Sequence, residues 1–159
     1  MTGQIYSFPC TGSQTGKNHY HVAVAQDGPD VWVVPAFSEG GTYITSRIRN
    51  IVRRGMRADR AAVTMDNSQV AVFLVGTPWR STWAICDADR RSRRYIKSMQ
   101  SVGTMAREGM VRIGCALLCW ILDNQTNYPE TLRDELLSYL LVACGHANHQ
   151  HPSFWTIAS

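Results

Sequence analysis

The residues best suited to chemistry are two histidines near the start of the chain. His19 and His21 lie in the sequence NHYHVAVA, whose alternation predicts a β-strand over residues 20–26. Side chains two positions apart in a strand point to the same face of the sheet. Because histidine titrates near neutral pH, either imidazole could take or give a proton. A strand face without any chemical role is the alternative interpretation.

Lys17 and Ser38 lie at positions that the neighbouring elements would bring toward these histidines. Residues 31–37 form an apolar run, VWVVPAF, which predicts a central strand. The sequence DGPD before it predicts a tight turn, so this strand would pair with residues 20–26 and end at Ser38. Lys17 lies in the polar, glycine-containing loop of residues 11–18. A strand-end cap and an ordinary loop lysine are the alternatives without function.

Positive charge is concentrated in the middle of the chain. Residues 47–97 carry twelve basic and four acidic side chains, a sum of +8, whereas residues 1–46 and 98–159 each sum to −2. Fourteen of the sixteen basic residues are arginine, whose planar fork can donate two hydrogen bonds to one phosphate. The central segment therefore predicts a polyanionic partner, with a solvated, salt-bridged face as the alternative.

Size and cysteine content limit the class of protein. A chain of 159 residues, of which 45% are hydrophobic, predicts one folded domain. An odd number of cysteines, five, and an N-terminus without the pattern of a signal peptide predict reduced thiols and a cytoplasmic location. The most apolar run, residues 111–122, is shorter than the roughly 20 residues that span a bilayer, so we expect a buried helix and no membrane partner.

The succession of patterns predicts an α+β domain that is mainly β. Short strands without β-α alternation favour a small barrel of about six antiparallel strands over a doubly wound fold. Residues 1–125 would form this barrel together with a helix over 104–122, and residues 126–159 a helical extension of the same domain. Trp32, inside an apolar strand, is expected in the core. The further strands are expected over residues 4–9, 61–65, 70–75 and 81–86, a basic amphipathic helix or ordered loop over 44–60, and a last helix over 130–144.

Two stretches resemble MazF/PemK-type toxins of toxin–antitoxin pairs. In residues 3–38, GQIYSFPCTGSQTGKNHYHVAVA followed by VWVVPAFS is similar to the opening of that family. Its members begin with a G-D-I strand, a G-S-E-Q-x-G-x-x-R-P loop, a V-V-V strand and a further strand ending in Thr or Ser. Within residues 89–117, DRRSRR followed by SVGTM resembles the family's I-D-x-x-R segment and its lead into the last helix.

The resemblance implies a fold, an activity and partners. The fold would be a small SH3-like barrel with flanking helices. The activity would be that of a homodimeric endoribonuclease, an RNA hydrolase that cuts single-stranded RNA by attack of the 2′-OH. It would need no metal and no cofactor. A cognate antitoxin protein would silence it by filling the RNA groove.

Carrying the family's catalytic pair over puts His19 at its loop arginine and Ser38 at its strand-end Thr or Ser. Because histidine replaces arginine, we expect His19 to act as the base, with Lys17 or a central arginine stabilising the phosphate. The alternative is a non-catalytic module that binds nucleic acid or protein through the arginine-rich segments 47–60 and 90–97. Besides the stacking residue Trp79, the expected RNA-binding residues are Arg47, Arg49, Arg53, Arg54, Arg80, Arg90, Arg91, Arg93 and Arg94.

The C-terminal tail allows a third interpretation. Its four potential zinc ligands fall within eight residues and are Cys144, His146, His149 and His151. Tetrahedral zinc sites usually take their ligands from two separated pairs that the fold brings together. We therefore expect no metal at this cluster, and a zinc-dependent protein remains the alternative.

Overall fold

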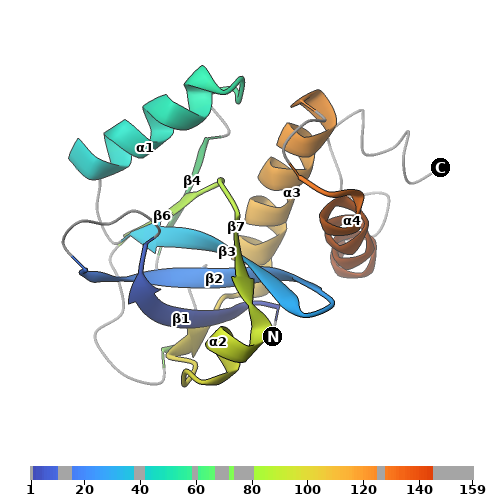
Figure 1. The fold of residues 1–159 in the computed structure, drawn as a ribbon. Coiled ribbons are helices and arrows are strands. Elements are labelled where there is room, and N and C mark those ends of the chain that lie inside the picture. The colour runs from blue at the N-terminus through green and yellow to red at the C-terminus, as the bar shows by residue number, and fades with distance from the viewer. Residues whose placement is uncertain are drawn as a thin grey trace.

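A computed structural model describes residues 2–10, 16–37, 42–58, 61–66, 72–73, 81–124 and 128–144 (Figure 1). Strands and helices alternate irregularly along these ranges, as expected for an α+β protein. The strands are β1 (Gln4–Pro9), β2 (Asn18–Asp27), β3 (Asp30–Phe37), β4 (Ala62–Asp66), β5 (Val72–Phe73), β6 (Ser81–Ile85), β7 (Asp89–Ser92) and β8 (Gly103–Thr104). The helices are α1 (Thr42–Arg53), α2 (Arg93–Lys97), α3 (Arg107–Asn124) and α4 (Glu130–Cys144).

The strands form one antiparallel sheet. Its order is β4-β6-β3-β2-β1-β8-β5, and β7 also pairs with β3. The predicted hairpin is confirmed: Asp27 of β2 pairs with Asp30 of β3, and between them Gly28 has a φ of 55°, which glycine adopts most easily. Among the described strands, the two ends of the sheet, β4 and β5, do not pair with each other. The sheet is therefore open at this point, and the expectation of a closed barrel is not met.

The strands β6 and β7 share one edge of β3. Ala36 of β3 pairs with Ala84 of β6, whereas Val33 pairs with Asp89 of β7. Four residues of the β6–β7 segment thus lie opposite two residues of β3, one of them a proline without an N–H to donate. The extra residues must leave the ladder, and Figure 1 shows a sharp corner between β6 and β7. Asp87 lies at this corner, outside the hydrogen-bonded strands.

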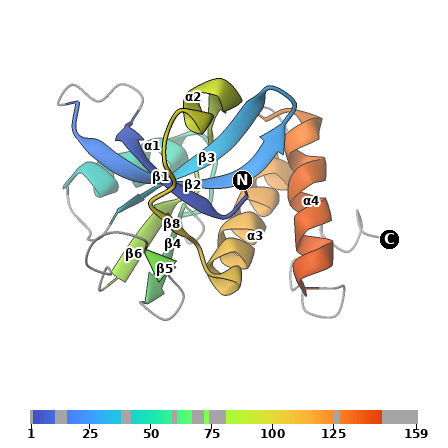
Figure 2. The same ribbon diagram turned by 90° about the horizontal axis from the view of Figure 1, so that it is seen from below.

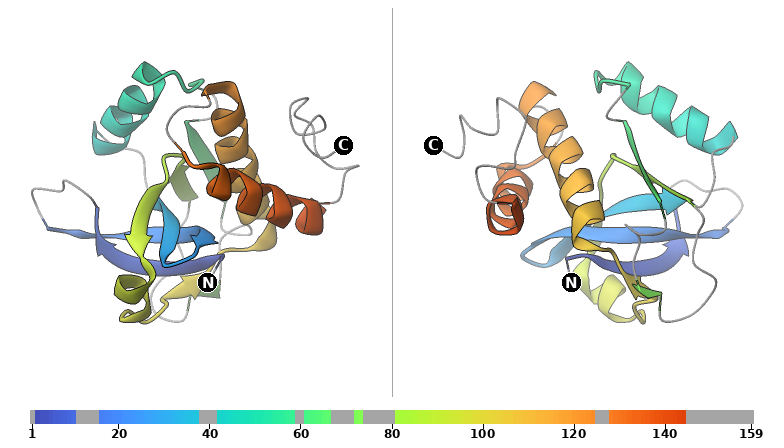
Figure 3. Two further views of the ribbon diagram at one scale, coloured as in Figure 1. Left: turned by 45° about the vertical axis from the view of Figure 1, so that its right-hand side comes forward. Right: turned by 180° about the vertical axis from the view of Figure 1, so that it is seen from behind.

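Helices cover both faces of the sheet. Figures 1 and 3 show α1, α3 and α4 on one side of β1–β3 and α2 on the other. The larger apolar cluster combines strand residues with Ile51 of α1, Leu117 of α3 and Leu136 of α4. The smaller cluster joins Phe8 of β1 to Ile96 of α2. The expectation that Trp32 belongs to the core is confirmed, because it is buried within the larger cluster.

The charged run DADRRSRRYIK was not predicted as regular structure, but it forms β7 and α2. Burial alternates along β7, since Asp89 and Arg91 are half-buried whereas Arg90 and Ser92 are exposed. The guanidinium of Arg91 lies over the ring of Phe8, 5.7 Å from its centroid. Arg91 here occupies the inward position that an apolar residue usually takes. It can do so because its aliphatic stem packs against apolar surface and its guanidinium makes a cation–π contact. A pattern based on hydrophobicity alone therefore misses this strand.

The last helix, α4, has the bounds expected from the sequence. It packs along α3, as Figure 2 shows from below. Leu132 and Leu136 are buried in the larger cluster with residues of β2 and β3. The hydroxyl of Thr131 donates to Oδ2 of Asp27 at 2.8 Å, which ties the start of α4 to the β2–β3 turn. None of the helices in the described part of the chain is both long and apolar enough to cross a membrane.

Replacing Leu136 with alanine is expected to lower the free energy of unfolding by about 2–5 kcal/mol, because it leaves a cavity between α4 and the sheet. Leu137, the next residue, is half-buried and lies outside the larger cluster, so Leu137→Ala is the matched control with a smaller expected loss. Urea denaturation monitored by circular dichroism measures both. Similar losses below about 1 kcal/mol for the two variants would contradict the packing of α4 on the sheet.

Candidate functional site

The imidazole of His21 is fully buried and fixed in one orientation. Its Nδ1 lies 3.0 Å from the backbone oxygen of His19. A carbonyl oxygen only accepts, so Nδ1 carries the proton and Nε2 is the acceptor. Nε2 lies 3.6 Å from Sγ of Cys10, and the ring stacks on Phe8 with centroids 3.8 Å apart. The ring thus joins β2 to Phe8, near the end of β1, and to Cys10, directly after β1.

His21 also stays uncharged. Its pKa is lowered from 6.5 to about 3. Burial is the largest cause, the positive charges of Arg91 and Arg47 act in the same direction, and the hydrogen bond to the backbone of His19 opposes them. Arg91 comes from β7 and Arg47 from α1, so two separate elements bring arginines close to this ring. A group with so low a pKa and no exposed surface is unsuited to proton exchange with a substrate at neutral pH. His21 therefore positions the backbone of His19.

His19 is half-buried and offers the more accessible imidazole. Burial, and then the nearby charge of Lys17, lower its pKa below 6.5, so the ring is mostly neutral at pH 7 and can accept a proton. Its ring meets Phe37 edge-on, with centroids 5.0 Å apart. Phe37 is the last residue of β3, and Ser38 follows it in the sequence. Ser38, Trp79 and Arg80 lie outside the described residues, so the structure places only Lys17 and His19 of the expected catalytic group.

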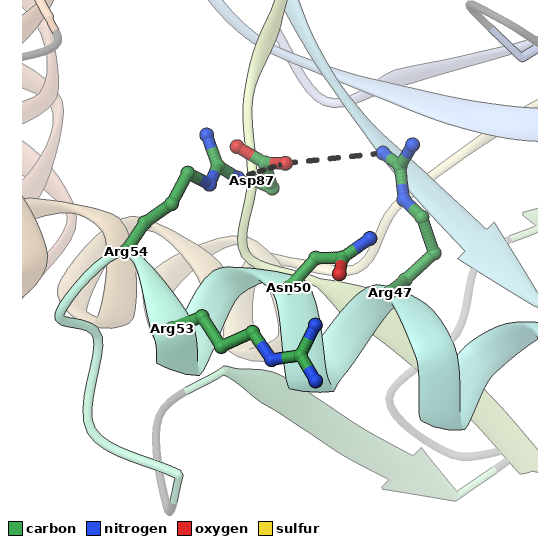
Figure 4. A pocket seen from close by; sticks show the side chains of 5 residues that line it. All are labelled: Arg47, Asn50, Arg53, Arg54 and Asp87. Atoms are coloured by element: carbon green, nitrogen blue, oxygen red, sulfur yellow. Dashed lines mark hydrogen bonds and ion pairs between the residues drawn. The ribbon is translucent and has the colours of Figure 1, made fainter.

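Two arginines of α1 and Arg54, directly after the helix, line a pocket. Arg47, Asn50, Arg53 and Arg54 line it together with Asp87, and its volume is about 480 Å³ (Figure 4). We call this site the arginine pocket. Positions 47, 50 and 54 are spaced by three and four, which puts these side chains on one face of the helix. Nη2 of Arg54 lies 2.5 Å from Oδ2 of Asp87, and Nη2 of Arg47 lies 4.0 Å from the same oxygen.

A tyrosine holds Asp87 in this position. The hydroxyl of Tyr128 donates to Oδ1 of Asp87 at 3.0 Å and accepts from the backbone N–H of Ala88 at 3.0 Å. Burial and the charge of Asp87 raise the pKa of Tyr128 well above 10, so the hydroxyl remains a donor. Arg54 lies over Trp120, 5.3 Å from the ring centroid, and Trp120 meets Tyr128 edge-on. The corner at Asp87 is thus supported by the junction of α3 and α4.

The other expected RNA-binding arginines are not part of this pocket. Arg49 is exposed on α1 but does not line it. Arg90 pairs with Asp30, with Nε 3.2 Å from Oδ2. Arg91 packs over Phe8 in β7, and Arg93 and Arg94 belong to α2. The expected RNA-binding arginines that the structure describes therefore fall into two groups, one on α1 and directly after it, and one on β7 and α2. The helices α1 and α2 lie on opposite sides of β1–β3 (Figure 3).

Three residues of the pocket environment were missed in the sequence: Asn50, Asp87 and Tyr128. The spacing of Asn50 between two arginines could have revealed it. Asp87 and Tyr128 are 41 positions apart and meet because strand pairing places the corner at Asp87 while α3 and α4 place Tyr128. A single sequence carries no signal for such a contact.

The structure also bears on thiols and metals. No disulfide joins the cysteines whose side chains it describes, Cys10, Cys86, Cys115 and Cys119. Burial raises the pKa of the Cys86 thiol to about 12, so this neighbour of Asp87 is not a nucleophile at neutral pH. Within the described ranges, no group of three or more His, Cys, Asp or Glu side chains is suitably placed for a metal. The four potential zinc ligands, Cys144, His146, His149 and His151, lie outside the described side chains, so the expectation of no metal at this cluster stays a prediction.

No protein-family model matches the chain, and no curated protein matches its sequence. The resemblance of residues 3–38 and 89–117 to MazF/PemK-type toxins remains a prediction.

Proposed function

We propose that this protein binds single-stranded RNA and cleaves it without a metal ion, by attack of the 2′-hydroxyl on the adjacent phosphate. The observation that carries the proposal is the pocket itself, which gathers three arginines and one aspartate in a single hollow. Arg47 lines the pocket and also lies close enough to His21 to lower its pKa. His19, two residues before His21 on β2, supplies the neutral imidazole of the proposal.

The proposed reaction assigns each step to a group in this region. The imidazole of His19 takes the proton of the 2′-OH, and the 2′ oxygen forms a bond to phosphorus. Arg47 and Lys17 stabilise the negative charge that develops on the phosphate oxygens. The bond from phosphorus to the 5′ oxygen breaks, and this oxygen takes a proton from water. The products are a 2′,3′-cyclic phosphate and a 5′-hydroxyl end.

The architecture and partners belong to the same proposal. An SH3-like barrel of the PemK type, a homodimer and silencing by an antitoxin follow from the resemblance of residues 3–38. The all-antiparallel pairing of β1, β2 and β3 supports this architecture. Ser38, at the position of the family's Thr or Ser, is proposed to contact the phosphate beside His19.

A non-catalytic RNA-binding module is the second candidate. It is favoured by one observation: His19 occupies the position of the resembling family's catalytic arginine. The pocket nevertheless supplies three arginines that could bind phosphate. Such a module would use the arginine pocket for phosphate contacts and would need no proton acceptor.

The deciding experiment offers the purified protein a labelled single-stranded RNA in the presence of EDTA. We expect products that end in a 2′,3′-cyclic phosphate, and binding that weakens with salt by about 0.7 logarithmic units per phosphate contact. A DNA homopolymer serves as the binding control, because it lacks the 2′-OH and cannot be cleaved by this reaction. Salt-dependent binding of RNA without any cleavage would favour the module, and the absence of binding would contradict both candidates.

A further inference from the structure

We propose that the arginine pocket holds the terminal phosphate of an RNA strand, a phosphomonoester dianion, rather than an internal phosphodiester. This assignment rests on the proposed RNA function and adds the class of substrate: strands with a phosphorylated end. The pocket would fix one end of the strand while the remainder runs along the surface toward His19.

The charge of the pocket matches a dianion. Three arginines and one aspartate line it, so its net charge is 3 − 1 = +2. A phosphate with a single ester bond carries about −1.5 to −2 charges at pH 7, whereas an internal phosphodiester carries about −1. A terminal phosphate would therefore neutralise the pocket, and an internal one would leave excess positive charge.

The donors of the pocket already converge on an anion. Arg47 of α1 and Arg54, directly after the helix, both face the same carboxylate oxygen of Asp87, with Asn50 between them (Figure 4). A terminal phosphate presents three acceptor oxygens, which suits several guanidinium groups better than the two free oxygens of a diester. Nε of Arg47 is buried without a hydrogen-bond partner among the described residues, a state that a bound anion would relieve.

The size of the pocket fits more than a free phosphate ion. Its volume of about 480 Å³ falls within the range of roughly 300–1,000 Å³ typical of small-molecule sites. A phosphate together with its nucleoside would fill such a space. The pocket thus has room for the end of a strand, with its phosphate and last nucleotide together.

Asp87 competes with this ligand. Its carboxylate pairs with Arg54, so an incoming phosphate must take over the guanidinium. Asp87→Asn removes one negative charge but keeps an oxygen that can accept from Tyr128. If the pocket is an anion site, this variant binds a phosphorylated strand more tightly, whereas a purely structural ion pair would give no gain.

The test compares three 2′-O-methyl RNA oligonucleotides of one sequence, which lack the attacking hydroxyl and stay intact. One carries a 5′-phosphate, one a 3′-phosphate and one no terminal phosphate, and fluorescence anisotropy with an internal label measures the affinities. We expect one phosphorylated form to bind about tenfold more tightly than the unphosphorylated one, a difference of about 1.4 kcal/mol. The preferred oligonucleotide shows whether the pocket binds a 5′- or a 3′-phosphate. Inorganic phosphate should compete with that oligonucleotide for the pocket. Equal affinity for all three would overturn the proposal.

Variants make the assignment specific to the pocket. Arg53→Gln, at an exposed position of the pocket, should abolish the preference for a phosphorylated end, and Asp87→Asn should strengthen it about tenfold. Arg49→Gln is the matched control, because it removes the same charge from the same helix outside the pocket, and should keep the preference. Equal losses for Arg53→Gln and Arg49→Gln, or weaker binding by folded Asp87→Asn, would overturn the proposal.

Cleavage of unmodified RNA without any end preference would contradict this inference alone, whereas end-specific binding without cleavage would contradict only the catalytic part of the proposed function.

Discussion

Replacing His19 with alanine is expected to slow RNA cleavage by about 10²–10⁴-fold, the usual contribution of a general base. The fold should survive, because the contact that His19 makes with His21 uses its backbone oxygen, which alanine retains. Single-turnover cleavage in EDTA measures the rate, and circular dichroism with thermal unfolding checks the structure. RNA affinity should change little, since the expected phosphate contacts lie on arginines.

Asn18→Ala provides the control for this variant, because Asn18 is exposed and precedes His19 on the same strand. The wild-type rate should also fall on acidification, since a protonated imidazole cannot act as base. The midpoint of this fall should lie below pH 6.5, because burial and Lys17 lower the pKa of His19. A His19→Ala protein that cuts as fast as the Asn18→Ala protein would show that His19 is not the base.

Acid is expected to destabilise the protein through His21. Its pKa is about 3 in the folded state and about 6.5 in the unfolded chain. Between these values the unfolded chain binds more protons than the folded one, so stability is complete above pH 6.5 and is lost as the pH falls toward 3. The expected loss between pH 7 and pH 4.5 is about 2–3 kcal/mol. Urea denaturation at several pH values in this range measures it.

The matched variant for this prediction is His21→Gln, which keeps a polar side chain but cannot titrate. It is expected to be less stable than the wild type at pH 7, because the stacking on Phe8 is lost. Its stability should nevertheless depend less on pH between 7 and 4.5, where most carboxylates remain ionised. The same pH dependence in both proteins would contradict a buried, neutral His21.

The elements with strong periodicity could be predicted from the sequence. The bounds of β1 and α4 agree with those expected, and the β2–β3 hairpin follows from the turn at Gly28. The strand β7 could not be predicted, because half-buried arginine occupies an inward position. The open edge of the sheet could not be predicted either, since strand order depends on pairings between distant segments.

The candidate site was predictable only where its residues are close in sequence. Lys17 directly precedes β2 and His19 lies at its start, and the arginines at positions 47, 53 and 54 lie on α1 or directly after it. The role of His21 depends on burial beneath Phe8, which its alternation with His19 does not reveal. Asp87 depends on the register of two strands against β3, and this information is absent from local patterns.

At the corner between β6 and β7, the residues that pair with β3 differ from the residue that lines the pocket. The ladder with β3 is fixed on both sides of the corner, by Ala84 before it and Asp89 after it. Of the four residues between them, Ile85 pairs with Ala62 of β4, and Cys86 and Ala88 are buried in the larger cluster, whereas Asp87 lines the pocket. Natural selection could therefore retune the ligand preference of the pocket through Asp87 alone while the core of the protein stays unchanged.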